Sequence, residues 1–175
     1  MSKGFGSGSS KRKINVKQFY LVNKFAEGEK YYHAKNYSKA ELIFSNLNNL
    51  GYEDPNLFLY LANIYILNGS NEKAIIVLKR ALESNSENPN LYFNLGTIYF
   101  KRSEYKNAIT YYLQGINLDP NNAFAYSNLA GCYEELFDYK NAVQNYKKAF
   151  LINKNLLQIR EKLLLLQPKI CDWSF

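Results

Sequence analysis

The residues that could carry out chemistry in this chain are few, and their spacing does not fit catalysis. His33 is the only histidine, with no metal-ligating partner four residues away and no serine or cysteine nucleophile pattern around it. Glu134 and Glu135 are adjacent on an expected helix, where neighbouring side chains point about 100° apart, so they cannot form an acid and base pair. We therefore expect no enzyme activity, no cofactor, no metal and no small-molecule substrate.

The cysteines and the apolar segments bear on the compartment. Cys132 and Cys171 are far apart and form no C-x-x-C pair, which favours neither a disulfide nor a metal site and suits a reducing compartment. The polar N-terminus is not followed by the apolar segment of a secretory signal. Four consecutive leucines, 163–166, fall far short of the roughly 20 apolar residues that span a bilayer. We expect a cytoplasmic protein without a membrane span.

A spacing of 34 residues organises most of the chain. It is kept by the small residues Gly28, Ala62, Gly96 and Ala130, by the tyrosines Tyr31, Tyr65, Tyr99 and Tyr133, and by the alanines Ala40, Ala74, Ala108 and Ala142. A register kept through four copies without insertion is the signature of a repeat protein. The copies cover residues 21–54, 55–88, 89–122 and 123–156, and many of the 16 tyrosines follow the register, which assigns them to a core.

Each copy contains two helical patterns. In the third copy, the two apolar stripes are formed by Tyr92, Leu95, Gly96 and Tyr99 and by Ala108, Tyr112, Gly115 and Ile116. Residues 102–104 separate the two patterns, and residues 119–121 separate this copy from the next. No segment indicates a strand. The expected helices run for about fourteen residues each, or roughly 21 Å.

This pattern resembles the tetratricopeptide repeat (TPR). The third copy matches the family's small, aromatic and proline positions most fully, with Gly96, Tyr99, Ala108, Tyr112, Gly115 and Pro120. The resemblance covers residues 21–156 and implies an all-α fold, an α-solenoid of four helix-turn-helix repeats in a right-handed superhelix. In the first copy, Lys24 and Glu27 replace apolar residues, as suits a terminal repeat that must stay soluble.

Both ends of the array differ from the repeats. Residues 157–167 resemble the C-terminal capping helix of this family, which Pro168 is expected to stop, leaving 168–175 as a tail. Lys154 replaces the proline that ends a repeat, which leaves open a run-on of the preceding helix into the cap. Residues 1–16 form a basic, Gly/Ser-rich segment that we expect to be disordered, and residues 17–156 hold the repeats.

The resemblance also indicates a binding face, because in this family the first helix of each repeat lines a concave groove. The groove positions yield these candidate partner-binding residues: Asn56, Tyr60, Asn63, Asn90, Phe93, Asn94, Thr97, Lys101, Ser127 and Asn128. Amide side chains offer both donors and acceptors, so Asn94 and Asn128 could hold the backbone of an extended peptide whatever its sequence. A structural interpretation stays open, since asparagine at position six is common in this repeat.

The family's carboxylate clamp is absent. Some members bind a C-terminal carboxylate through lysine at position five and asparagine at position nine of one repeat. Position five in this chain is occupied by Phe25, Leu59, Phe93 and Ser127. We therefore do not expect capture of chaperone tails, and the groove is expected to hold a protein or peptide of another kind.

The net charge of +7 arises mainly outside the repeats. The first 20 residues contain five cations and no acid, whereas the repeats are nearly neutral. This leaves open a second function, in which the tail binds an anionic surface or nucleic acid. Five dispersed charges specify no partner, however, so we favour a solvated tail or a linker and do not expect nucleic acid as the main partner.

A third alternative comes from the C-terminus. The tripeptide Cys171, Asp172 and Trp173 resembles the junction at which the repeats of O-linked N-acetylglucosamine transferases pass into the catalytic region. That resemblance implies a substrate-recruiting fragment of a glycosyltransferase without its catalytic domain, although packing of Trp173 on the cap helix is the simpler explanation. Our main prediction is an interaction scaffold or adaptor. The sequence leaves open whether it forms homo-oligomers and who its partner is.

Overall fold

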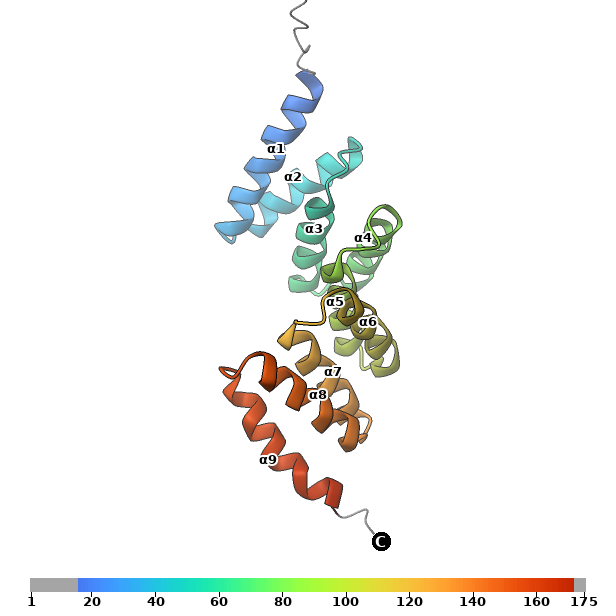
Figure 1. Cartoon of the computed structure of the whole chain (residues 1–175). Helices are drawn as coiled ribbons and strands as arrows, with labels where there is room; N and C mark the ends of the chain where they lie inside the picture. Colours follow the sequence, from blue (N-terminus) through green and yellow to red (C-terminus); the bar gives the residue numbers. More distant parts are fainter. Residues whose placement is uncertain (1–15, 172–175) are drawn as a thin grey trace, which may run out of the picture. The chain divides into compact units, whose positions relative to one another are not determined.

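The computed structural model describes residues 16–171, where it forms nine helices and no strand (Figure 1). The chain divides into two compact units, one up to Glu53 and one from Asp54 onward. The first unit contains α1 (Val16–His33) and α2 (Tyr37–Asn49). The second contains α3 (Pro55–Leu67), α4 (Asn71–Ser84), α5 (Pro89–Lys101), α6 (Tyr105–Leu118), α7 (Ala123–Glu135), α8 (Tyr139–Ile152) and α9 (Leu157–Cys171).

The first unit is a helix pair with an aromatic core. The ring of Phe25 on α1 lies 5.7 Å from that of Phe44 on α2 and 5.5 Å from that of Tyr52. Position five of the repeat was expected to face a groove, but Phe25 is buried in this pair because Phe44 and Tyr52 enclose it. The helix α1 begins at Val16, ahead of the repeat register, and Val16, Phe19 and Tyr20 are exposed there.

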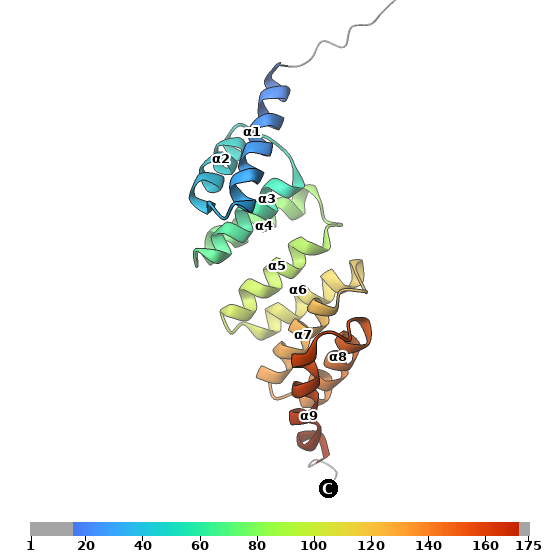
Figure 2. The same ribbon diagram turned by 90° about the vertical axis from the view of Figure 1, so that its left-hand side faces the viewer.

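The second unit stacks three helix pairs in chain order, α3 with α4, α5 with α6 and α7 with α8, and α9 packs on α8 (Figures 1 and 2). Its core follows the 34-residue register. Leu61, Leu95 and Leu129 are at most 1% exposed at one repeat position, and Leu57, Leu91 and Ala125 are buried at another. Because each helix pair buries the same positions against its neighbours, the repeat in the sequence becomes a repeat in the packing.

Glycine allows the helices of the third repeat to approach closely. A Cβ atom on Gly96 of α5 would lie 2.8 Å from the ring of Tyr112 on α6, and Gly115 leaves room for the ring of Phe93. Next to them, Tyr99 and Tyr111 stack with their centroids 5.2 Å apart. Large and small side chains thus alternate across the pair, as close packing requires.

In the second unit, short polar side chains set where the first helix of each repeat begins. The N-cap residues Asp54 and Asn88 accept hydrogen bonds from the backbone N–H groups of Asn56 and Asn90, at 2.8 and 3.0 Å. Asn122 caps α7 in the same way through the N–H of Ala125. Part of the abundant asparagine therefore serves helix capping, which supplies acceptors to N–H groups that have no intrahelical partner.

The C-terminal end corrects two expectations. The helix α8 stops at Ile152 despite Lys154, because the side chain of Asn153 accepts a hydrogen bond from the N–H of Asn155 and forms a turn. The helix α9 then continues through Pro168 to Cys171, so the prediction that Pro168 ends it is wrong. Proline removes one hydrogen bond to the carbonyl of Leu164, which lies on the exposed face, where water can replace that bond.

Candidate partner-binding face

The first helices of the second unit share a row of polar side chains. On α5, the Nδ2 of Asn94 donates a hydrogen bond of 3.1 Å to the Oδ1 of Asn63 on α3. Both side chains are half-buried, and the bond joins residues from neighbouring repeats. It uses one of the two N–H donors of Asn94, whose carbonyl oxygen accepts no hydrogen bond among the described residues.

A second contact connects α5 to a buried tyrosine of α6. The Oγ1 of Thr97 donates to the backbone carbonyl of Phe93 at 2.9 Å and lies 3.1 Å from the hydroxyl of Tyr112. Burial raises the pKa of Tyr112 to about 12, with smaller opposing contributions from its side-chain neighbours Thr97 and Asn128. Tyr112 therefore stays protonated near neutral pH and is linked by this contact to Thr97. We call Asn63, Asn94, Thr97 and Asn128 the polar row.

The other expected site residues lie around this row in different settings. Asn56 and Asn90 are exposed at the first turns of α3 and α5, and Lys101 is exposed at the last residue of α5. Tyr60 is half-buried on α3. The ring of Phe93 packs over Gly115 and against the cluster around Tyr112, so it also stabilises its own repeat.

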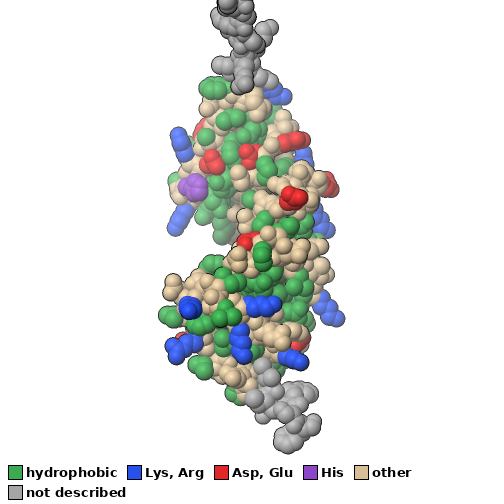
Figure 3. All heavy atoms as spheres, in the orientation of Figure 1, with side chains coloured by type: hydrophobic (Ala, Val, Ile, Leu, Met, Phe, Trp, Pro, Cys, Tyr) green, Lys and Arg blue, Asp and Glu red, His purple; other side chains and the backbone are tan. Residues whose placement is uncertain are grey.

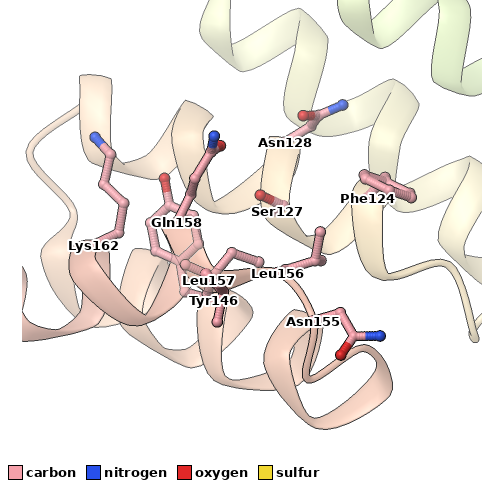
Figure 4. A pocket seen from close by; sticks show the side chains of 10 residues that line it. Phe124, Ser127, Asn128, Tyr146, Asn155, Leu156, Leu157, Gln158 and Lys162 are labelled. Atoms are coloured by element: carbon pink, nitrogen blue, oxygen red, sulfur yellow. The ribbon is translucent and has the colours of Figure 1, made fainter.

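A pocket of about 540 Å³ opens between α7, α8 and α9. In Figure 4, Phe124 lies on one side, Gln158 and Lys162 lie on the other, and Ser127 and Asn128 come from α7. The pocket is completed by Tyr146, Asn155, Leu156, Leu157 and Ile159. We refer to this cavity as the α7–α9 pocket. Two of the expected site residues, Ser127 and Asn128, therefore line a cavity that the cap helix completes.

An ion pair lies beside this pocket. The Nζ of Lys162 on α9 lies 2.8 Å from Oε1 of Glu134 on α7, and the hydroxyl of Tyr146 on α8 donates to the other oxygen at 2.9 Å. Burial, and next the hydrogen bond to Glu134, raises the pKa of Tyr146 above its ordinary value. The carboxylate is thus shared by two helices, and its charge is balanced within the protein.

The sequence reasoning missed the contribution of α9 to this face. Leu157, Gln158 and Lys162 follow Ala123, Phe124 and Asn128 by one further step of the 34-residue register. Extending the register one helix beyond the fourth repeat would have found them. Tyr146 was assigned only to the core from its repeat phase, and the structure adds a place in the wall of the pocket.

The remaining candidates for chemistry are dispersed or buried. No group of three or more histidine, cysteine or acidic residues could hold a metal ion within residues 16–171. In the same range, none of the helices has the length and apolar character needed to cross a membrane. The thiol of Cys132 is fully buried, and burial raises its pKa to about 12, so it stays a neutral core group.

Three sequence profiles match the second unit. The profile described as TPR repeat matches residues 62–101, and two described as tetratricopeptide repeat match residues 89–122 and 125–156. No curated protein matches the sequence.

Several solved structures share the fold. A crystal structure of MamA superposes with a TM-score of 0.76 at 21% identity, covering 81% of this chain and 83% of that one. MamA from Desulfovibrio magneticus RS-1 has a TM-score of 0.79 at 14% identity, with coverages of 87% and 86%. YrrB, described as a TPR protein with an unusual peptide-binding site, has a TM-score of 0.73 at 20% identity, with coverages of 81% and 73%.

The helix pairs, their register and the matched profiles define the class of this protein as a helical-repeat scaffold for protein–protein interaction. The chain belongs to the tetratricopeptide repeat family.

Proposed function

We propose that the second unit binds an extended peptide segment of a partner protein along the polar row and the α7–α9 pocket. The observation that carries this proposal is the bond between Asn94 and Asn63, since it holds two half-buried amides in place before any ligand arrives. Groups that are already ordered lose less conformational freedom on binding. The peptide-binding site described for YrrB supports the same use of this fold.

The spacing of the row suits an extended backbone. Packed helices lie about 8–10 Å apart, which equals the rise of roughly three residues in an extended chain. Each peptide residue presents one donor and one acceptor on its backbone. Amides on successive helices can therefore bond the backbone at about every third residue, and this binding depends little on the peptide's sequence.

The same residues argue for binding without catalysis. The row consists of amides and a hydroxyl, and the one carboxylate beside the pocket is held by Lys162 and Tyr146. None of these side chains forms a nucleophile and base pair. We therefore propose a non-enzymatic adaptor that acts in the cytoplasm, and subcellular fractionation of the tagged chain tests the compartment.

The two alternative functions gain no supporting observation. The glycosyltransferase resemblance rests on Cys171, Asp172 and Trp173, of which Asp172 and Trp173 lie outside the described residues. The basic segment 1–15 lies outside them as well. We retain the scaffold as the function that the described residues support best.

The test begins with peptides selected by display against the full chain. Fluorescence anisotropy then compares their affinity for the wild type, Asn94→Ala and Asn128→Ala, and we expect each substitution to weaken binding about tenfold. Asn117→Ala is the matched control, because Asn117 is an exposed amide on α6 outside the row. Equal affinities for all four proteins would contradict the proposal.

A further inference from the structure

We infer that the α7–α9 pocket is the anchor site of the bound peptide, and that it takes one large, uncharged apolar side chain such as leucine or phenylalanine. This inference rests on the proposed function and names the chemistry of the partner. A volume of about 540 Å³ lies within the range of roughly 300–1,000 Å³ that is typical of ligand pockets.

The walls of the pocket favour an apolar side chain. Phe124 of α7 is 63% exposed and Leu157 of α9 is 69% exposed, yet both line the same cavity. A side chain inserted between them would remove apolar surface of both walls and of the ligand from water. Below them, the ring of Tyr146 is 5% exposed and adds a rigid aromatic surface.

The charge balance of the pocket favours an uncharged side chain. Lys162 is the only charged side chain among the described residues that line the pocket, and its ammonium group is paired with Glu134 at 2.8 Å. A carboxylate on the ligand would have to compete with Glu134 for this ammonium group, while a basic side chain would meet a cation. An uncharged side chain leaves the pair intact and meets no opposing charge.

Polar groups of the pocket can hold the backbone on either side of the anchor. Ser127 and Asn128 come from α7, whereas Asn155 and Gln158 come from the α8–α9 turn and the first turn of α9 (Figure 4). The pocket thus combines apolar walls with donors and acceptors, which is the usual composition of a site that orients its ligand. Asn128 belongs to both the pocket and the polar row, so the anchor continues the proposed peptide path.

The strongest alternative to an apolar side chain in the pocket is an acidic side chain of the ligand. Figure 3 shows several Lys and Arg side chains over the α7–α9 end of the second unit, with few acidic side chains among them in that view. Long-range attraction from these cations would favour a carboxylate in the pocket. The experiment must therefore compare apolar and acidic probes directly.

The test is an NMR titration of the full chain, labelled with ¹⁵N, with four blocked amino acids. The probes are the N-acetyl amides of leucine, phenylalanine, alanine and glutamate. We expect the leucine and phenylalanine probes to shift the amide resonances of Ser127, Asn128, Leu157 and Gln158, and the alanine and glutamate probes to leave them in place. Stronger binding of the glutamate probe, or shifts confined to other residues, would overturn the inference.

A matched pair of variants locates the site. Leu157→Glu adds a charge to the pocket at an exposed position in the first turn of α9, where an acidic residue suits the helix dipole. We expect it to weaken the leucine probe at least tenfold. Leu164→Glu is the control, since Leu164 is 66% exposed on the same helix but outside the pocket, and the affinity should stay within twofold of the wild type.

The peptides selected above separate this inference from the proposed function. A peptide that Asn94→Ala weakens and Leu157→Glu does not would contradict the anchor site and leave the proposed function standing. Shifts in the pocket without any peptide bound along the polar row would contradict the proposed function and leave the pocket as a separate binding site.

Discussion

Two places in the second unit have a tyrosine at the same repeat position but bond it differently. We call the surroundings of Tyr112 in the third repeat the inner junction, and those of Tyr146, next to the cap helix, the terminal junction. Tyr112 on α6 and Tyr146 on α8 stand 34 residues apart, and both are almost fully buried. The hydroxyl of Tyr112 bonds Thr97, within the polar row. The hydroxyl of Tyr146 bonds Glu134, which also pairs with Lys162 of the cap helix.

The difference follows from one residue on each first helix. Thr97 occupies the position that Gly131 occupies in the next repeat, so Tyr146 has no hydroxyl of that kind to meet. The hydroxyl of Tyr146 bonds instead to the carboxylate of Glu134, which lies about one helical turn after Gly131 on α7. The inner junction is a neutral hydrogen-bond network, whereas the terminal junction combines an ion pair with an open pocket. The comparison shows that the polar contacts change where the last repeat meets the cap helix, although the buried core positions there keep the 34-residue register.

The largest expected effect is on stability, and it should be global for a substitution in an internal helix and local for one in the cap helix. Leu95 on α5 and Leu166 on α9 are at most 1% exposed. Leu95→Ala should lower the free energy of unfolding by about 2–5 kcal/mol, because it leaves a cavity in a helix with neighbours on both sides. Leu166→Ala should instead release α9 locally, since the terminal helix packs only against the last repeat.

Hydrogen exchange distinguishes these two outcomes. Leu95→Ala should raise exchange rates through α5 and its neighbours, and Leu166→Ala only in α9 and the adjoining parts of α7 and α8. Equal and global effects of the two substitutions would show that the cap helix unfolds together with the repeats.

The next largest effect is a change in stability that has opposite signs when alanine replaces two different glycines. A Cβ on Gly96 would lie 2.8 Å from the ring of Tyr112, whereas on Gly131 it would lie 3.6 Å from the ring of Phe100. Gly96→Ala should destabilise the protein by about 1–3 kcal/mol through overpacking. Gly131→Ala should stabilise it by about 0.5–1 kcal/mol, because alanine loses less backbone freedom in a helix. Urea denaturation measures both, and a shift of the same sign in both variants would contradict the packing.

A smaller effect concerns the hydroxyl of Tyr112. Tyr112→Phe should cost about 0.5–1.5 kcal/mol near neutral pH through loss of the hydrogen bond to Thr97. Because burial raises the pKa of Tyr112 from 10.0 to about 12, its contribution is complete below pH 10 and is lost as the pH rises toward 12.

Denaturation curves at several pH values check that direction. The stability of Tyr112→Phe should fall less steeply than that of the wild type between pH 10 and 12. Tyr146→Phe provides the parallel measurement at the terminal junction, where burial and Glu134 also raise the pKa. Parallel slopes for the wild type and Tyr112→Phe would exclude Tyr112 as the source of the alkaline loss.

The smallest expected effect is that of the terminal ion pair. Lys162 and Glu134 have side chains that are 47% and 23% exposed, so water screens their attraction. A double-mutant cycle with Glu134→Gln and Lys162→Met should give a coupling energy of about 0.2–1 kcal/mol that decreases with added salt. A coupling that salt does not reduce would indicate a more enclosed pair than the structure shows.

Much of the fold could be predicted from the 34-residue register. The turn at residues 102–104 and the break at residues 119–121 occur where the pattern indicated. The stop at Pro168 was wrong, because a proline rule describes the local backbone and cannot tell that the lost bond lies on an exposed face. The break after Ile152 depends on the side chain of Asn153. Asparagine is a common turn residue, but the sequence analysis considered only the replacement of the usual proline by Lys154.

The candidate site was less accessible to sequence reasoning. The register indicated Asn63, Asn94, Thr97 and Asn128 as residues of one face, and their role in binding stays a prediction. It could not indicate that Asn94 bonds Asn63, 31 residues away, or that Lys162 bonds Glu134, 28 residues away. Side-chain partners depend on the angles at which helices cross, and these angles are not encoded in residue spacing alone.

The sequence by itself therefore determined the helices, the repeated core and the side of each repeat on which polar residues gather, because helical periodicity and the register act locally and repeat. Only the tertiary structure decided that Tyr112 joins the polar row, that Tyr146 bonds Glu134, which also pairs with Lys162 of the cap helix, and that a pocket remains between α7 and α9. Those features depend on which helix lies beside which, and the last repeat differs from the repeat before it because the neighbour on one of its sides is a single capping helix.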